Sequence, residues 1–406
     1  MQIEQAVSAL VKEISPLTSG EVCSLVNATG RILGDDITAG ISVPSFPKSA
    51  MDGYAVLASD IEGASLEHPV KLQVLECIYA GDKVPAALLT MRSLEGCAVR
   101  IMTGAVVPEG FDTVVKQEDT DYGEDVVSIY TAQKPFVNYC KVGEDIAEGT
   151  LVLNKGTLIG RSEIGVLASL GVSEVKAVRK LRVAVISTGS EIIDVGQELG
   201  EAQIYNSIAY TLTSALSKPS FEVCFSSVPD DEKAIVEAVK KAEETSDIII
   251  TTGGVSVGKR DLLPRVLATI GAKVVFTGVN VKPGSPTIGA VLNGKALLCL
   301  SGNPYAAVAN FDLYMGHIIE AKTGCSAFVP VKERAVLDSE FSKPSNVRRL
   351  VRARVDSGRV KILNKNQMSS VLSSFIGANC YIDFPQGSMV NPGDEVDILR
   401  IPEALL

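Results

Sequence analysis

Residues 247–261 read D-I-I-I-T-T-G-G-V-S-V-G-K-R-D, and this stretch decides how the surrounding chain folds. The three isoleucines after Asp247 form a short apolar run, which is typical of a strand buried on both faces of a parallel sheet. Two threonines and two glycines follow directly. They predict an abrupt end to the strand and a tight turn toward the next helix.

The glycine pair makes this turn a candidate anion-binding site. Gly253 and Gly254 can take positive φ and point successive N–H groups at one place, which makes an anion-binding nest. Ser256 and Gly258 continue the surface of small residues. Asp261 precedes a predicted helix over residues 262–270, either as its N-cap or as a carboxylate facing the ligand. A phosphate-bearing ligand with a metal beside it fits this pattern, and a plain strand-to-helix turn with a capping Asp is the alternative.

Strands and helices alternate on both sides of this stretch. Apolar runs predict strands at residues 183–187, 222–228, 273–276 and 296–300, and helical spacing predicts helices at residues 200–217, 231–245, 262–270 and 305–323. Such alternation predicts an α/β domain with a doubly wound parallel sheet and right-handed crossovers.

The rest of the chain does not show this alternation of strands and helices. Helices are predicted over residues 2–14, 18–28 and 162–170, and short β runs separated by turn residues fill residues 56–140 and the part after residue 324. We therefore expect an α/β multidomain protein with four domains. They are a discontinuous, elongated N-terminal linker domain (1–48 and 141–178), an inserted β domain (49–140), the α/β domain (179–325) and a C-terminal small β-barrel domain (326–406).

Composition narrows the possible partners. The net charge of −10 argues against nucleic acid, because nucleic-acid binding rests on neutralising phosphates. The eight cysteines form no C-x-x-C pair, and two histidines are too few for a His-rich zinc site. The first residues lack the basic and apolar regions of a signal peptide, and no run approaches 18 apolar residues. We expect a soluble cytoplasmic protein that binds no membrane.

Several predicted strands of the α/β domain end in small or acidic residues. These loops read S-T-G-S-E up to Glu191, V-P-D-D around Asp230, T-T-G-G at Gly253, and Ser301-Gly302-Asn303-Pro304. In a parallel sheet all of them lie at the carboxyl edge, where ligands bind. Glu191, Asp230 and Asp261 would then surround the nest, and a divalent metal between them and phosphate oxygens would relieve their repulsion. The alternative is that each acid caps a helix.

Lys282 adds a cation in the stiff loop K-P-G-S-P. A lysine suits an oxyanion or phosphate because it is a compact charge, although a plain surface lysine is the simpler interpretation. The sequence has no G-x-x-x-x-G-K-[ST] and no G-x-S-x-G, so it supports neither P-loop nor serine-hydrolase chemistry.

Taken together in order, the motifs resemble a known family. They are S-A-M-D-G-Y-A-V, I-M-T-G-A-V-V-P-E-G-F-D-T-V-V, S-T-G-S-E, V-P-D-D, T-T-G-G-V-S-V-G, V-K-P-G-S-P, S-G-N-P-Y-A and N-Q-M-S-S-V-L-S-S-F. The series is similar to the MoeA family, the molybdopterin molybdenumtransferases, which includes the E domain of gephyrin. The resemblance implies an α/β domain of the MogA type and a magnesium-dependent transferase that inserts molybdate into adenylylated molybdopterin, releasing AMP and molybdenum cofactor.

The resemblance also implies roles for individual residues. Asp52 and Thr103 would act catalytically from the partner subunit of a homodimer, in a cleft shared with the α/β domain of the other subunit. Glu191, Asp230 and Asp261 would act at the reaction centre and hold Mg²⁺ against the pyrophosphate. The pterin nucleotide and the oxyanion would be bound by Gly253, Gly254, Ser256, Gly258, Lys282, Ser285, Ser301, Gly302, Asn303, Pro304 and Ser369. A MogA-type adenylyltransferase and recipient molybdoenzymes are the protein partners that it implies.

The chain departs from the family pattern at several positions. Gly278 stands where a second lysine is usual, Ser285 replaces the next lysine, and Cys140 and Val142 stand in a region that is often rich in arginine. The usual Tyr-Asp-[Ser/Thr]-Asn reads Y-N-S-I from Tyr205. These changes remove cations from the expected anion site. They leave open a paralogue that prefers tungstate, a non-catalytic pterin-binding scaffold, or nucleotide chemistry without metal insertion.

Overall fold

The computed structural model describes residues 1–255, 262–341, 345–363 and 366–406. The chain forms two compact units. The main unit contains Met1–Asp35, Lys155–Ile164 and Ser173–Leu406, and the inserted unit contains Asp36–Asn154 and Gly165–Val172. The division into four domains remains a prediction. Among the described helices, none combines the length and the apolar character that crossing a membrane requires.

A six-stranded sheet forms the centre of the main unit. Its strand order is β15-β12-β16-β20-β19-β17, and the first four strands are parallel, whereas β19 runs antiparallel to both of its neighbours, β20 and β17. The strands are β12 (Leu181–Thr188), β15 (Phe221–Val228), β16 (Ile248–Thr252), β17 (Lys273–Thr277), β19 (Ile288–Leu292) and β20 (Lys295–Leu300).

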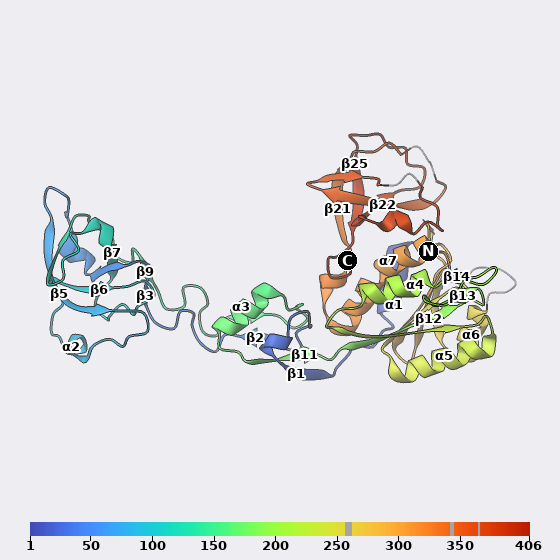
Figure 1. Ribbon diagram of the computed structural model, residues 1–406, viewed down its shortest axis with the longest axis horizontal. Coiled ribbons are helices and arrows are strands. Elements are labelled where there is room, and N and C mark those ends of the chain that lie inside the picture. Colours follow the sequence, from blue (N-terminus) through green and yellow to red (C-terminus); the bar gives the residue numbers. More distant parts are fainter. Residues whose placement is uncertain (256–261, 342–344, 364–365) are drawn as a thin grey trace. The chain divides into compact units, whose positions relative to one another are not determined.

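Helices cover both faces of this sheet (Figure 1). In β16, Ile248 and Ile250 pack with α1, α4 and α7, whereas Ile249 packs with α5 and α6 on the opposite face. This burial on both faces explains the continuous apolar run in the sequence. The helices are α1 (Ile3–Val11), α4 (Ser207–Ala215), α5 (Glu232–Thr245), α6 (Leu263–Thr269) and α7 (Pro304–Thr323).

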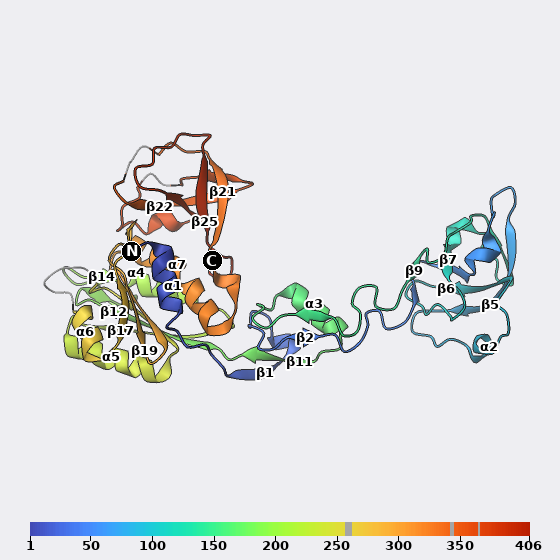
Figure 2. The same cartoon turned by 180° about the vertical axis from the view of Figure 1, so that it is seen from behind.

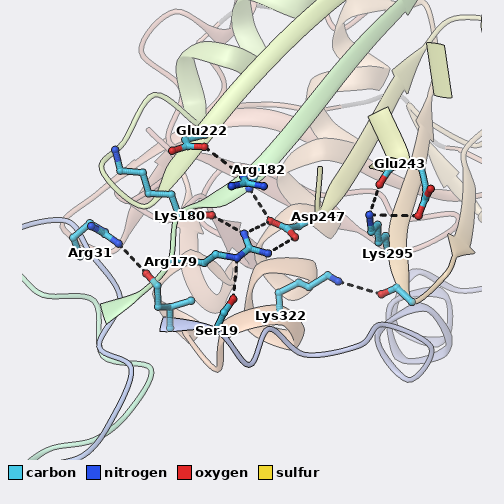
Figure 3. A network of polar contacts seen from close by, with 12 residues as sticks. Ser19, Arg31, Arg179, Lys180, Arg182, Glu222, Glu243, Asp247, Lys295 and Lys322 are labelled. Atoms are coloured by element: carbon cyan, nitrogen blue, oxygen red, sulfur yellow. Dashed lines mark hydrogen bonds and ion pairs between the residues drawn. The ribbon is translucent and has the colours of Figure 1, made fainter. Parts of the chain in front are cut away.

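A polar network fixes the start of β16 (Figure 3). Asp247 accepts two hydrogen bonds from the Arg179 guanidinium, at 2.7 and 2.8 Å, and one from the Arg182 backbone N–H at 2.9 Å. Arg179 also donates to the Ser19 hydroxyl. Burial raises the pKa of Asp247, but these hydrogen bonds and the positive charge outweigh it, so the pKa is lowered overall.

The C-terminal part of the main unit is a closed five-stranded barrel (Figure 2). Its pairing runs β22-β23-β21-β25-β24 and returns from β24 to β22, so no strand edge is left open in the ring. The strands are β21 (Val331–Leu337), β22 (Arg348–Asp356), β23 (Arg359–Lys361), β24 (Cys380–Phe384) and β25 (Glu395–Arg400). Strand β18 (Val281–Lys282) of the preceding segment pairs with β22.

The inserted unit contains a five-stranded sheet with the order β7-β4-β6-β5-β8. Its strands are β4 (Gly53–Val56), β5 (Val70–Ile78), β6 (Cys97–Ile101), β7 (Thr113–Lys116) and β8 (Val126–Ile129). Smaller elements are helix α2 (Ala86–Leu89) and two strand pairs, β2 (Ile37–Thr38) with β10 (Leu151–Leu153) and β3 (Lys48–Ser49) with β9 (Tyr139–Cys140). Helix α3 (Arg161–Ser169) begins in the main unit and ends in the inserted unit.

The main differences between the structure and the sequence prediction are the following. Residues 18–28 form strand β1 (Gly20–Ser24) and a 3₁₀ turn (Leu25–Asn27) rather than a helix, because β1 pairs with β11 (Glu174–Val178), which lies far away in sequence. The helix predicted from residue 200 begins only at Ser207, after the short strand pair β13 (Ile192–Ile193) and β14 (Ile204–Tyr205). Strand β19 was not predicted, and it makes one edge of the sheet antiparallel.

Candidate functional site

A cavity of about 350 Å³ lies where the loops at the carboxyl edge of the parallel strands meet. The register places Ser187 of β12 beside Thr252 of β16, and Thr252 beside Leu300 of β20, so all three strands end together. The lining residues are Thr188, Glu191, Ile192, Ile204, Tyr205, Asn206, Ser207, Ile208, Asp230, Gly253, Gly254, Val255, Ser301, Gly302, Asn303 and Pro304. This first cavity therefore brings together the predicted residues of four separate loops.

The two glycines after β16 are required by both conformation and space. Gly253 has a φ of +96° and Gly254 a φ of +63°, in the left-handed region that side chains disfavour. A Cβ atom on Gly253 would lie 2.5 Å from the Thr188 carbonyl oxygen. The Cα of Gly253 is also only 3.5 Å from the place of a Cβ on Gly302. The backbones of the two loops thus approach each other closely, and neither glycine of the turn can be replaced without strain.

A buried network of side chains supports the floor of the first cavity. Ser187 donates to the Asn206 Oδ1 at 3.2 Å and Thr252 donates to the Ser187 Oγ at 3.2 Å. Asn206 donates to the Ser227 hydroxyl at 3.1 Å and accepts from the Ala209 N–H as the N-cap of α4. Asn206 therefore links three strands of the sheet to a helix.

Two of the three predicted metal-binding acids lie in this cavity. Glu191 and Asp230 both line it with exposed side chains. The Asp230 N–H donates to the Ser190 hydroxyl at 3.4 Å, which joins their loops. Asp231, rather than Asp230, caps helix α5 by accepting from the Ala234 N–H at 2.9 Å. Helix capping therefore does not account for Asp230.

The third acid, Asp261, lies outside the described residues, as do Ser256 and Gly258. Within the described part of the chain, no three His, Cys, Asp or Glu side chains gather closely enough to hold a metal. Glu191 and Asp230 supply oxygen donors, and Mg²⁺ is usually held by one or two carboxylates together with substrate phosphates. The donor set fits that ion.

A second cavity of about 370 Å³ adjoins the first and shares Ser301 and Asn303 with it. Its lining residues are Lys282, Pro283, Gly284, Ser285, Pro286, Ser301, Asn303, Ala306, Arg349, Gln367 and Ser369. Lys282 and Arg349 are register partners on β18 and β22, so two cations stand side by side at its wall. The predicted residues Lys282, Ser285 and Ser369 are thus brought to one place.

Helix α7 connects the two cavities and holds the Lys-Pro-Gly loop. Its N-cap Asn303 lines both of them, and the N-terminus of this 20-residue helix carries partial positive charge that favours anions. Further along α7, the buried Asn310 donates to the Gly284 carbonyl at 2.9 Å. Gly284 has a φ of +98°, and a Cβ there would lie 2.5 Å from the Asn310 Nδ2.

Asp52 and Thr103 lie together in the inserted unit. The Thr103 N–H and hydroxyl both donate to the Asp52 Oδ1, each at 2.7 Å. These two hydrogen bonds lower the pKa of Asp52, so the carboxylate stays ionised. The neighbouring Gly53 has no space for a side chain, because a Cβ would lie 1.9 Å from the Val115 carbonyl oxygen. Both predicted residues therefore belong to one polar pair.

The sequence did not single out several residues that line or support these cavities. Arg349 belongs to an arginine-rich stretch that is usually a solvated face, and only its pairing with β18 brings it to Lys282. Asn310 lies inside a helix, where an amide gives no signal of its contact with a loop. Gln367 stands in the N-Q-M-S-S motif already noticed, so its position beside Ser369 could have been anticipated.

Comparison with known proteins connects this geometry to a family. Residues 1–171 match the MoeA N-terminal region (domain I and II), residues 184–321 a probable molybdopterin binding domain, and residues 334–401 the MoeA C-terminal region (domain IV). The chain is 35% identical over 405 residues to the molybdopterin molybdenumtransferase of Staphylococcus aureus strain MSSA476, covering 98% of this chain and 94% of that protein. The same named protein of Staphylococcus epidermidis strain RP62A is 35% identical over 406 residues, covering 98% and 95%.

A solved structure has the same fold over the whole chain. The molybdopterin biosynthesis moeA protein of Pyrococcus horikoshii OT3 is 28% identical and superposes with a TM-score of 0.84, covering 98% of this chain and 99% of that one.

Proposed function

Because the chain belongs to the MoeA family of molybdopterin molybdenumtransferases, we propose that it inserts molybdate into adenylylated molybdopterin, releasing AMP and molybdenum cofactor. The observation that carries the proposal is the pair of adjoining cavities that share Ser301 and Asn303. One is lined by a glycine nest and carboxylates, and the other by two cations. A pterin nucleotide and an oxyanion can therefore lie side by side.

In the first cavity the nest at Gly253 and Gly254, together with Ser301 and Gly302, would hold the pyrophosphate through N–H and hydroxyl groups. Asn303 and Pro304 would place the start of helix α7 against the same charge. Glu191 and Asp230 would hold Mg²⁺, with Asp261, Ser256 and Gly258 proposed to complete the site. When bound, Mg²⁺ supplies positive charge that neutralises phosphate oxygens.

In the second cavity Lys282 and Arg349 would bind the molybdate oxygens, with Ser285 and Ser369 as hydroxyl donors. The bond that breaks is the phosphoanhydride between AMP and the pterin phosphate, and an oxygen from water forms the new bond to phosphorus as AMP leaves. Negative charge grows on the leaving AMP as this bond breaks, and fixed positive groups at that place favour the transition state over the bound substrate. The contribution of the chain is thus positioning and charge neutralisation.

The assembly is also part of the proposal. We propose a cytoplasmic homodimer in which Asp52 and Thr103 of one subunit complete the cleft of the other, with a MogA-type adenylyltransferase supplying the nucleotide and molybdoenzymes receiving the product. Thr103 holds the Asp52 carboxylate in its ionised form through two hydrogen bonds, which supports the proposed role of this pair in the cleft.

Incubation with adenylylated molybdopterin, Mg²⁺ and molybdate tests the activity. We expect AMP release that requires molybdate and that falls at least about 100-fold in Glu191→Gln, since a lost metal-binding carboxylate weakens transition-state charge stabilisation. Glu191 is exposed, so the variant should fold normally. AMP release that depends on tungstate instead would identify a change of oxyanion, in a site where Gly278 and Ser285 stand in place of lysines. Tight nucleotide binding without turnover would refute the proposed transferase activity and indicate a pterin-binding scaffold.

A further inference from the structure

Arg352 of strand β22 is a buried cation that the proposed reaction does not use. Its residue exposure is 1%, and its guanidinium carbon lies 3.3 Å from the ring centroid of Tyr305 and 5.0 Å from that of Phe375. Within the described residues no carboxylate forms an ion pair with it. A buried charge without a counter-ion is costly, so the groups that satisfy it must be well placed.

Among the described residues, the hydrogen-bond acceptors of the Arg352 side chain lie in one short segment, residues 366–371, here called the cavity segment. The Arg352 backbone N–H and Nε donate to the Gln367 Oε1 at 3.2 and 3.3 Å. The two terminal nitrogens donate to the Val371 carbonyl and, at 3.4 Å, to the Asn366 carbonyl. One planar guanidinium therefore holds both ends of the segment, a geometry that an ammonium cannot reproduce.

The opposite side of the cavity segment is attached to the first turn of helix α7. The Tyr305 N–H donates to the Ser369 carbonyl at 2.9 Å. The hydroxyl of the same tyrosine donates to the Leu350 carbonyl in β22 at 2.6 Å. Tyr305 is thus bound to the barrel through its hydroxyl, to Arg352 through its ring, and to the segment through its backbone. Gln367 and Ser369 of this segment line the second cavity.

We propose that Arg352 is a positioning residue that fixes the cavity segment against helix α7 and thereby sets the affinity of the second cavity for its oxyanion. The inference rests on the proposed function for the identity of the oxyanion, but not for the positioning itself. Ser369 reaches the cavity only while the segment is held between the guanidinium and Tyr305. A displacement of about 1 Å in such a group is enough to lose much of its contribution to binding and rate.

The test uses Arg352→Met, which keeps the length and apolar stem, and Arg352→Lys, which keeps the charge without the planar fork. The control is Arg359→Met in the same barrel, because Arg359 is exposed and pairs only with Asp338 among its described ion-pair partners. Hydrogen exchange of the peptides that cover residues 366–371 and Tyr305 measures positioning. The molybdate concentration at half-maximal AMP release measures the functional consequence.

We expect both Arg352 variants to exchange the segment amides at least about tenfold faster, since the acceptors in the segment lose their donors. The half-saturating molybdate concentration should rise about tenfold, with a smaller change for the pterin nucleotide. Helix α5 should keep its protection, which shows that the fold is intact. Arg359→Met should leave both readouts unchanged.

Unchanged exchange of the segment would overturn the proposal, and so would faster exchange with unchanged molybdate dependence. If Arg352→Met does not fold, Arg352→Lys decides by the same two readouts. If the parent protein releases no AMP with molybdate or tungstate, the proposed function fails, and the hydrogen exchange alone then decides whether Arg352 positions the segment.

Discussion

Asp312 on helix α7 is a carboxyl group in the interior of the main unit, with 7% of the residue exposed. It accepts a hydrogen bond from the Tyr381 hydroxyl of the barrel strand β24. Burial raises its pKa to about 7, and the bond from Tyr381 opposes part of this rise. A single side chain therefore couples the contact between helix and barrel to protonation near neutral pH.

Replacement of Asp312 by Asn should remove a pH dependence of stability. The folded pKa lies above the unfolded value, so the native state binds the proton more tightly, and its stabilisation is full below about pH 4 and lost as the pH rises through 7. One pKa unit corresponds to about 1.4 kcal/mol, so wild-type unfolding free energy should fall by up to about 4 kcal/mol from this group. Urea unfolding at pH 5 and pH 8 measures the difference from Asp312→Asn.

Tyr381→Phe is the matched control for this prediction. Loss of the hydroxyl removes a bond that favours the ionised form, so the pKa of Asp312 should rise and the loss of stability should move to higher pH. If wild type and Asp312→Asn depend on pH equally, the carboxyl does not titrate as the structure indicates.

At the scale of elements, strand β16 is held at its start by side-chain hydrogen bonds and ends in a glycine turn. Asp247 at its start is held by the Arg179 guanidinium and the Arg182 N–H (Figure 3). Gly253 at its end turns the backbone into the first cavity. The strand between them is buried on both faces, so neither end can shift without disturbing the core.

Arg179→Gln should lower the free energy of unfolding by about 2–3 kcal/mol, because the largely buried Asp247 charge loses its bidentate partner. Arg182→Gln is the control. The Arg182 side chain pairs with Glu222 at 3.5 Å on an exposed surface, and its backbone bond to Asp247 survives, so the change should stay within about 0.5 kcal/mol. Chemical denaturation of both variants measures the values, and equal effects would contradict the assignment.

Gly253→Ala should cost about 1–3 kcal/mol of stability and also abolish AMP release, because the residue combines positive φ with a carbonyl at 2.5 Å from the new Cβ. Gly271→Ala is the matched control. Gly271 also has positive φ, at +70°, but open space around its Cβ position, so it should lose about 1 kcal/mol and keep its activity. Equal activity of the two variants would show that the nest does not bind substrate.

At the scale of the whole molecule, the proposed residues are divided between the two units of the chain. Asp52 and Thr103 lie in the inserted unit, and Glu191, Asp230 and Lys282 lie in the main unit. The proposed shared cleft takes the former from one subunit and the latter from the other. This arrangement predicts that two inactive variants can restore each other.

A tagged heterodimer of Asp52→Asn and Glu191→Gln chains should show about half the wild-type AMP release, since one of its two clefts receives only intact residues. Each variant alone should be nearly inactive. Purification through two different affinity tags isolates the mixed species for the measurement. A mixed species as inactive as its parents would mean that the cleft is formed within one chain.

The sequence predicted the structure correctly where a local property, such as the periodicity of one segment or the conformation of one turn, decides it. The isoleucine run of β16 needs burial on both faces, and the glycines after it need positive φ, so the α/β fold class and the position of the nest followed from local chemistry. The β-rich character of the segments before and after this core followed from their short apolar runs, and their division into separate domains stays a prediction. The pairing of β1 was missed because its partner β11 is distant in sequence. Strand β19 pairs with the adjacent β20 through the Asn293-Gly294 turn, a local hairpin signal that the prediction did not use.

The sequence by itself therefore determined the parallel α/β core, the glycine turn and the presence of acids at loops on the carboxyl edge. Only the tertiary structure decided which side chains share a cavity. Arg349 reaches Lys282 through strand pairing, Asn310 meets Gly284 through helix packing, and Arg352 of strand β22 stacks on Tyr305 of helix α7. Contacts of this kind join residues distant in the chain, and no local preference of backbone or side chain encodes them.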